Sequence, residues 1–174
     1  MKTRYYLGAL LAFPFLTMTA PGEPVAVQEP VVRMVFFFSP TCRHCELVMS
    51  QHLPVFFQIY GGTPDVRMND SIPDREQAFY LMSSSKLEML LVDATKPDGG
   101  SLYEASMVTH PVEERRKGVP RLILGDSVLV GETEIPGSFH RFVRRALAEG
   151  GLDWPEIPGL PEALAVIPKA ATRN

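Results

Sequence analysis

The sequence predicts an α/β fold in which a central mixed sheet of about four strands is flanked by helices. Two apolar runs, residues 31–38 and 87–92, have the length and composition of strands that are covered on both faces. Segments with helical periodicity separate them, so these two strands should be parallel. A Gly-Asp pair divides residues 118–131 into two short apolar runs, which predicts an antiparallel hairpin.

The segment between the first two strands should contain a helix and an insertion. Apolar residues recur at spacings of three and four over residues 42–60, which predicts a helix, and Pro54 should kink it. We expect a helical insertion near residues 63–86. Within it, residues 73–83 are predicted to be helical and residues 66–68 to form a short strand.

The second half of the chain predicts two further helices and a tail. A turn-rich connection, residues 93–100, should lead into a helix over residues 101–109. The last helix is predicted over residues 135–149, where apolar residues gather on one face. The proline-rich tail, residues 151–174, holds the only tryptophan. We expect it to lie on the domain as far as Leu160 and to fray beyond that residue.

The first twenty residues differ in composition from the rest of the chain. Two basic residues precede an apolar run over residues 5–20, and no acidic residue occurs before Glu23. A basic start followed by an apolar stretch is typical of an export signal. We therefore expect residues 1–20 to be a signal peptide or an uncleaved N-terminal anchor that tethers the protein to a membrane. Either role predicts a place outside the cytoplasm, in the periplasm or at the cell exterior, where thiols can be oxidised.

The remainder predicts a linker followed by one domain. Residues 21–30 are rich in proline and indicate a linker. Residues 31–150 are numerous enough to form one domain that folds without disulfide staples. The chain has 174 residues and a net charge of −3, and no basic patch recurs on one face. We therefore expect no nucleic-acid partner.

The only two cysteines lie in the stretch Cys42-Arg43-His44-Cys45, directly after the first apolar run. A redox dithiol is the favoured interpretation, because two cysteines at this spacing on a helix start can form a strained, reducible disulfide. A structural zinc site usually needs four ligands, and the chain has no second cysteine pair. A purely structural disulfide is the third interpretation, but closing so short a loop would stabilise the fold little.

The predicted position of Cys42 favours its thiolate form. At the start of a helix its sulfur lies near unpaired backbone N–H groups and the positive end of the helix dipole. Arg43 and His44 add positive charge nearby. A donor beside the thiolate stabilises the reduced form, which makes the disulfide more oxidising. The motif therefore slightly favours a protein that oxidises its substrates.

A second motif, Gly118-Val119-Pro120, stands at the start of the predicted hairpin. A proline at the start of a strand that is not an exposed edge needs a special reason, and a cis peptide bond is one. Such a bond would turn the backbone of Val119 outward beside the sulfurs, where it could pair with an extended peptide.

These features together resemble the thioredoxin superfamily, and in particular small exported bacterial proteins with a thioredoxin domain. The resemblance covers about residues 31–149 and implies a thioredoxin-like fold. It implies that Cys42 is the attacking cysteine, Cys45 the resolving cysteine and Pro120 the cis-proline. His44 resembles the histidine between the cysteines of strongly oxidising members.

The chain also departs from the family pattern. Thr41 stands where a tryptophan usually precedes the first cysteine, and Arg43-His44 replaces the Gly-Pro pair of reducing thioredoxins. The first strand lacks the buried acid that cytoplasmic thioredoxins use for proton transfer. These differences leave the direction of electron flow weakly determined.

The sequence thus predicts an extracytoplasmic thiol–disulfide oxidoreductase that needs no cofactor. Its partners should be protein thiols and disulfides, together with a membrane electron donor or acceptor. The residues expected to carry the reaction are Cys42, Cys45, His44 and Pro120, and those expected to contact the substrate are Thr41, Arg43 and Val119. The alternative is a copper-handling module on the same scaffold, in which the two cysteines and a nearby histidine hold the metal.

Overall fold

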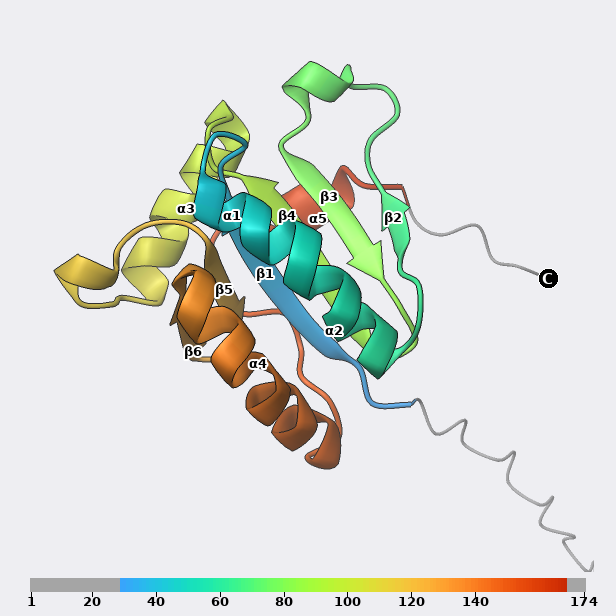
Figure 1. The fold of residues 1–174 in the computed structure, drawn as a ribbon. Coiled ribbons are helices and arrows are strands. Elements are labelled where there is room, and N and C mark those ends of the chain that lie inside the picture. Colours follow the sequence, from blue (N-terminus) through green and yellow to red (C-terminus); the bar gives the residue numbers. More distant parts are fainter. Residues whose placement is uncertain (1–28, 169–174) are drawn as a thin grey trace, which may run out of the picture.

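The computed structural model describes residues 29–168 as an α/β fold built on one six-stranded mixed sheet (Figure 1). The strands are β1 (Val32–Phe38), β2 (Asp65–Arg67), β3 (Phe79–Ser83), β4 (Leu87–Asp93), β5 (Arg121–Leu124) and β6 (Ser127–Val130). They lie in the order β2-β3-β4-β1-β5-β6. Strands β1 and β4 are parallel, and β5 and β6 form an antiparallel hairpin. Both predicted relations are therefore confirmed.

Helices cover both faces of the sheet. They are α1 (Arg43–Leu47), α2 (Leu53–Tyr60), α3 (Pro97–Thr109), α4 (Gly131–Ala148) and α5 (Leu160–Ala165). Helices α1, α2 and α4 lie over one face, and α3 and α5 lie over the other (Figure 1). Strand β1 is buried along most of its length because it contributes to both apolar clusters. This explains its nearly continuous apolar sequence.

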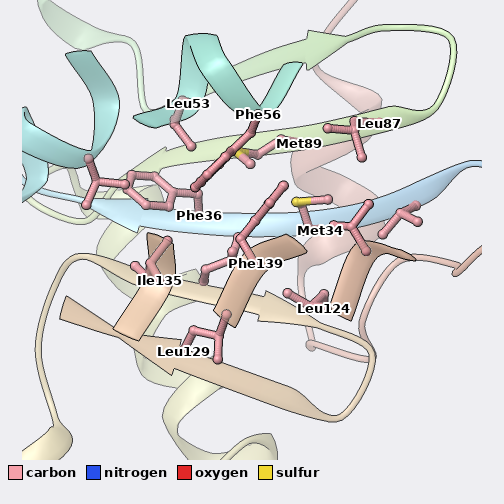
Figure 2. Close-up of a cluster of buried hydrophobic side chains, with 14 of the residues drawn as sticks. Met34, Phe36, Leu53, Phe56, Leu87, Met89, Leu124, Leu129, Ile135 and Phe139 are labelled. Carbon is pink, nitrogen blue, oxygen red and sulfur yellow. The ribbon is translucent and has the colours of Figure 1, made fainter. Parts of the chain in front are cut away.

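The apolar cluster under α1, α2 and α4 fixes the position of the first long helical segment. Figure 2 shows Met34 and Phe36 of β1 extending into it together with Phe56 of α2 and Phe139 of α4. The rings of Phe56 and Phe139 stack with their centroids 3.9 Å apart. Aromatic pairs of this kind stabilise a core beyond the area that they bury. Helix α4 is thereby held against the segment that follows the two cysteines.

The predicted helical insertion over residues 63–86 is wrong, although the short strand expected at residues 66–68 is confirmed as β2, and strands β2 and β3 bring the sheet to six strands instead of about four. The segment forms strands β2 and β3, with a single 3-10 turn at Asp74–Glu76. Strand β3 pairs along its whole length with β4. Its side chains alternate between the two faces of the sheet, since Leu81 packs in one cluster and Tyr80 and Met82 pack in the other. Residues 79–83 form a strand because the edge of β4 offers them backbone hydrogen bonds, and strand preference depends on such tertiary context.

The helix predicted over residues 42–60 is interrupted immediately before Pro54. Helix α1 passes into a π-helical turn at Val48–His52, from which α2 continues. Pro54 has no N–H to donate to the carbonyl four residues before it, and its ring would crowd that carbonyl in a regular helix. A wider turn at this place is the expected kind of accommodation.

Helix α3 begins at Pro97, four residues before the predicted start, because Gly99 allows it to lie against the end of β4. A Cβ atom added at Gly99 would stand 2.1 Å from the carbonyl oxygen of Asp93. Gly99 and Gly100, which fall in the predicted turn-rich connection, therefore lie inside a helix, and Gly99 makes a close backbone contact there. Helix α4 also begins early, at Gly131, with Pro136 within it.

We expect the substitution Gly99→Ala to lower the free energy of unfolding by about 2–3 kcal/mol, because a backbone atom in contact cannot move aside without shifting a strand. Gly137→Ala in α4 is the matched control. Nothing lies within 4 Å of its added Cβ, so it should raise stability by about 0.5–1 kcal/mol. Urea unfolding of both variants measures the difference. Equal midpoints would contradict the contact between α3 and β4.

The tail extends further onto the domain than predicted. Leu152 pairs with Val32, and α5 follows with Leu160, Ala163 and Ile167 buried against the sheet. The expected fraying after Leu160 is therefore wrong as far as residue 168, since Ala163 and Ile167 lie beyond Leu160 and are buried in the same apolar cluster as Val35 and Phe37 of β1. Across residues 29–168, none of the helices has the length and apolar character needed to cross a membrane.

The predicted signal peptide or anchor at residues 1–20, the membrane tether at residues 5–20 and most of the linker lie outside the described residues.

Candidate functional site

Cys42 caps the first helix, as the sequence predicted. Strand β1 ends at Phe38, and a short loop brings Cys42 to the N-cap position of α1. The backbone N–H of Cys45 donates to Sγ of Cys42 at 3.3 Å. The sulfur therefore takes the place of the oxygen that usually accepts a free N–H group at a helix start.

The two sulfurs differ in their access to solvent. Both cysteines are free thiols; Cys42 is partly exposed, whereas Cys45 is 0% exposed and belongs to the apolar cluster beneath α1. Burial, followed by a hydrogen bond with Cys42, raises the pKa of the Cys45 thiol to about 12. Cys42 is thus the sulfur that another molecule can reach, and Cys45 lies behind it as a protonated thiol.

The predicted second motif lies beside Cys42. The Val119–Pro120 peptide bond is cis, as expected. The thiol of Cys42 donates to the backbone carbonyl of Val119 at 3.6 Å, across 77 positions of the chain. The side chain of Val119 packs at the edge of both apolar clusters. The structure therefore brings Cys42, Cys45, Val119 and Pro120 together.

His44 faces a partner that the sequence analysis missed. Its side chain is 62% exposed, and its Nδ1 lies 2.9 Å from Oε2 of Glu132 in the first turn of α4. The hydrogen-bond partners of Cys42 Sγ are the Cys45 N–H and the Val119 carbonyl, so His44 supplies no direct contact to that sulfur. Glu132 escaped notice because the predicted helix began at residue 135. An acidic pair just before that helix was the available signal.

Thr41 and Arg43, the other predicted substrate contacts, are exposed on either side of Cys42. The hydroxyl of Thr41 lies 3.1 Å from that of Ser39 within the loop. Neither side chain touches the sulfurs through a hydrogen bond. They border the site without taking part in its internal geometry.

A hollow of about 410 Å³ opens next to the cis-proline. It lies between the start of α1, the loop before β5 and the first turn of α4. Its lining residues are His44, Val119, Pro120, Val130, Gly131, Glu132, Thr133 and Glu134. The site thus combines a reactive-cysteine position with an adjoining depression of mixed polarity.

Within residues 29–168, no three or more His, Cys, Asp or Glu side chains gather closely enough to hold a metal ion. The fold and the site define an α/β protein with a dithiol at the carboxyl end of a central strand. One of its two sulfurs is accessible and the other is buried. Comparison of the chain with family models, with curated proteins and with solved structures finds no match.

Proposed function

We propose that this protein is an extracytoplasmic thiol–disulfide oxidoreductase of thioredoxin-like fold, which exchanges disulfides with protein substrates through Cys42 and Cys45. The observation that carries the proposal is the unequal pair of sulfurs. Sγ of Cys42 is partly exposed and accepts the N–H of Cys45 at 3.3 Å, while Cys45 is buried behind it. Exchange chemistry requires this inequality, because one sulfur must meet the substrate while the other leaves or resolves.

In the oxidising direction the cycle starts from a Cys42–Cys45 disulfide. A substrate thiolate attacks Sγ of Cys42, a new S–S bond forms, and the electron pair of the broken bond stays on Cys45, which takes up a proton. The second substrate thiolate then attacks the substrate's own sulfur in the mixed disulfide, and Cys42 leaves as a thiolate. Two electrons have passed from the substrate to the dithiol. A membrane electron acceptor would restore the disulfide.

The surroundings of the sulfurs support this direction. The N–H of Cys45 donates to Sγ of Cys42 at 3.3 Å, so it is placed to stabilise the thiolate that leaves the mixed disulfide, and Cys45 stays protonated because burial raises its pKa. The hydrogen bond to the leaving sulfur favours the reduced dithiol, so it makes the disulfide a stronger oxidant. His44 gives no hydrogen bond to Sγ of Cys42, since its Nδ1 lies against Glu132. The extracytoplasmic location rests on the sequence of residues 1–20 alone.

Equilibration with glutathione buffers tests the proposal. We expect Cys42 and Cys45 to titrate together as one two-electron couple, with a reduction potential nearer to about −120 mV than to about −270 mV. Thiol alkylation followed by mass measurement reports the reduced fraction at each glutathione ratio. A potential near about −270 mV would reverse the assigned direction. A dithiol that never exchanges with glutathione would contradict the function itself.

A further inference from the structure

The hollow beside Cys42 contains a carboxylate oxygen that lacks a hydrogen-bond partner. Oε2 of Glu132 is shielded from solvent, and no donor among residues 29–168 makes a hydrogen bond to it. His44 Nδ1 lies at ion-pair distance, 2.9 Å, but the contact is not a hydrogen bond. Although this oxygen is covered, the Glu132 side chain as a whole is 37% exposed, so its carboxylate can meet a cation or an N–H group that enters the hollow.

The neighbouring carboxylate, by contrast, is already satisfied. Both oxygens of Glu134 accept hydrogen bonds from Nη2 of Arg116, at 2.8 and 2.7 Å, and one of them also accepts the N–H of Val130. Arg116 and Glu134 therefore cancel each other's charge. Glu132 is left as the carboxylate in the hollow that has capacity for a further donor.

The walls of the hollow suit an aliphatic chain that ends in a cation. Val119, Pro120 and Val130 supply apolar surface, and the backbone at Gly131 adds no side chain. Lysine and arginine side chains bury their methylene stems along such surfaces and keep the charged group at a polar partner. The distance from Cys42 to this wall is short, since its thiol contacts the Val119 carbonyl at 3.6 Å.

We propose that the hollow is a subsite for a lysine or arginine side chain that flanks the reactive cysteine of the substrate protein, and that Glu132 determines this specificity. The proposal rests on the proposed function, because it describes which substrates that same dithiol prefers. In the mixed disulfide, the substrate backbone lies beside Val119, its flanking side chain passes along Pro120 and Val130, and its cation reaches the carboxylate of Glu132. His44 then shares the carboxylate with the substrate.

Oxidation of three matched peptides tests the proposal. The peptides carry the same two cysteines and have lysine, glutamine or glutamate at both positions flanking the first cysteine. With the oxidised full-chain protein, the lysine peptide should be oxidised about fivefold faster than the glutamate peptide at low salt. Each rate is divided by the rate of the same peptide with oxidised glutathione, because flanking charges alter the reactivity of the peptide's own thiol; in the Glu132→Gln variant the corrected ratio should fall to nearly one. The measurement is the second-order rate constant for peptide disulfide formation.

Glu149→Gln provides the matched control. It removes the same charge from the far end of α4, where Glu149 pairs with the exposed Arg145, so the ratio should stay near that of the unaltered protein. If Glu149→Gln lowers the ratio as much as Glu132→Gln, or if all three peptides react equally, the subsite is overturned while the proposed function stands. If no peptide is oxidised by any form of the protein, the proposed function itself fails.

Discussion

Replacing Cys42 with serine is expected to lower the rate of disulfide exchange by about three orders of magnitude or more, the scale seen when an enzyme loses its nucleophile. Cys42 is the partly exposed sulfur, and its neighbour Cys45 is buried with a raised pKa. A buried, protonated thiol is a poor nucleophile, so Cys45 cannot take over. The rate of exchange with a small dithiol peptide measures the loss.

Cys45→Ser should trap the substrate where Cys42→Ser fails to react with it, and it serves as the matched comparison. Cys42 can still attack a substrate disulfide, but no second thiol resolves the product, so a covalent complex accumulates. Non-reducing electrophoresis and mass measurement detect that complex. Serine remains a good N-cap, so Cys42→Ser keeps the start of α1 and isolates the chemical effect. Equal trapping by the two variants would contradict the assigned order of attack.

The centre of the site could be predicted because local rules determine it. Strand β1 was recognisable from its continuous apolar run, and the spacing of Cys42 and Cys45 placed both on one turn of a helix. The hairpin was recognisable from Gly125-Asp126 between two apolar runs. Each of these features depends on residues close together in the sequence, and each was confirmed.

The features that escaped prediction depend on contacts between distant segments. Strand β3 has a composition compatible with a helix, and only the open edge of β4 makes it a strand. Glu132 gains its importance from His44, 88 positions away, because the two side chains meet between α1 and α4. No period or spacing in the sequence encodes that meeting.

Arg121 is the clearest case of this kind. Nothing in the sequence of the predicted hairpin distinguishes it from an exposed strand residue, yet its side chain is 0% exposed. Its Nη2 donates to the carbonyls of Ser106 and His110 at the end of α3. A cation at this place offsets the negative end of the helix dipole, and it adds a donor to the His110 carbonyl and a second donor to the Ser106 carbonyl, which already accepts the His110 N–H. Burial lowers its pKa, which is the cost of that contact. The arrangement ties α3 to the strand that follows Pro120.

Phe139→Ala is expected to be the most destabilising of the packing changes, at about 3–5 kcal/mol of unfolding free energy. Phe139 is 0% exposed, and its ring stacks on Phe56 with the centroids 3.9 Å apart (Figure 2). Truncation removes the contact that holds α4 against α2 and leaves a cavity that the sheet behind it cannot close. Urea unfolding should show a lower midpoint at an unchanged slope.

Phe142→Ala on the same helix separates this effect from the general loss of an aromatic ring. Phe142 is only partly buried at the edge of the same cluster, where the guanidinium of Arg141 lies 5.1 Å from its ring centroid. Because Phe142 buries less apolar surface on folding than Phe139, its truncation should lower the free energy of unfolding by only about 1–2 kcal/mol. Helix α4 also carries Glu132, so loosening it moves one wall of the hollow away from His44. Phe139→Ala should therefore weaken the preference for lysine-flanked peptides, whereas Phe142→Ala should leave it in place. Equal destabilisation by both variants would contradict the central place of Phe139 in the core.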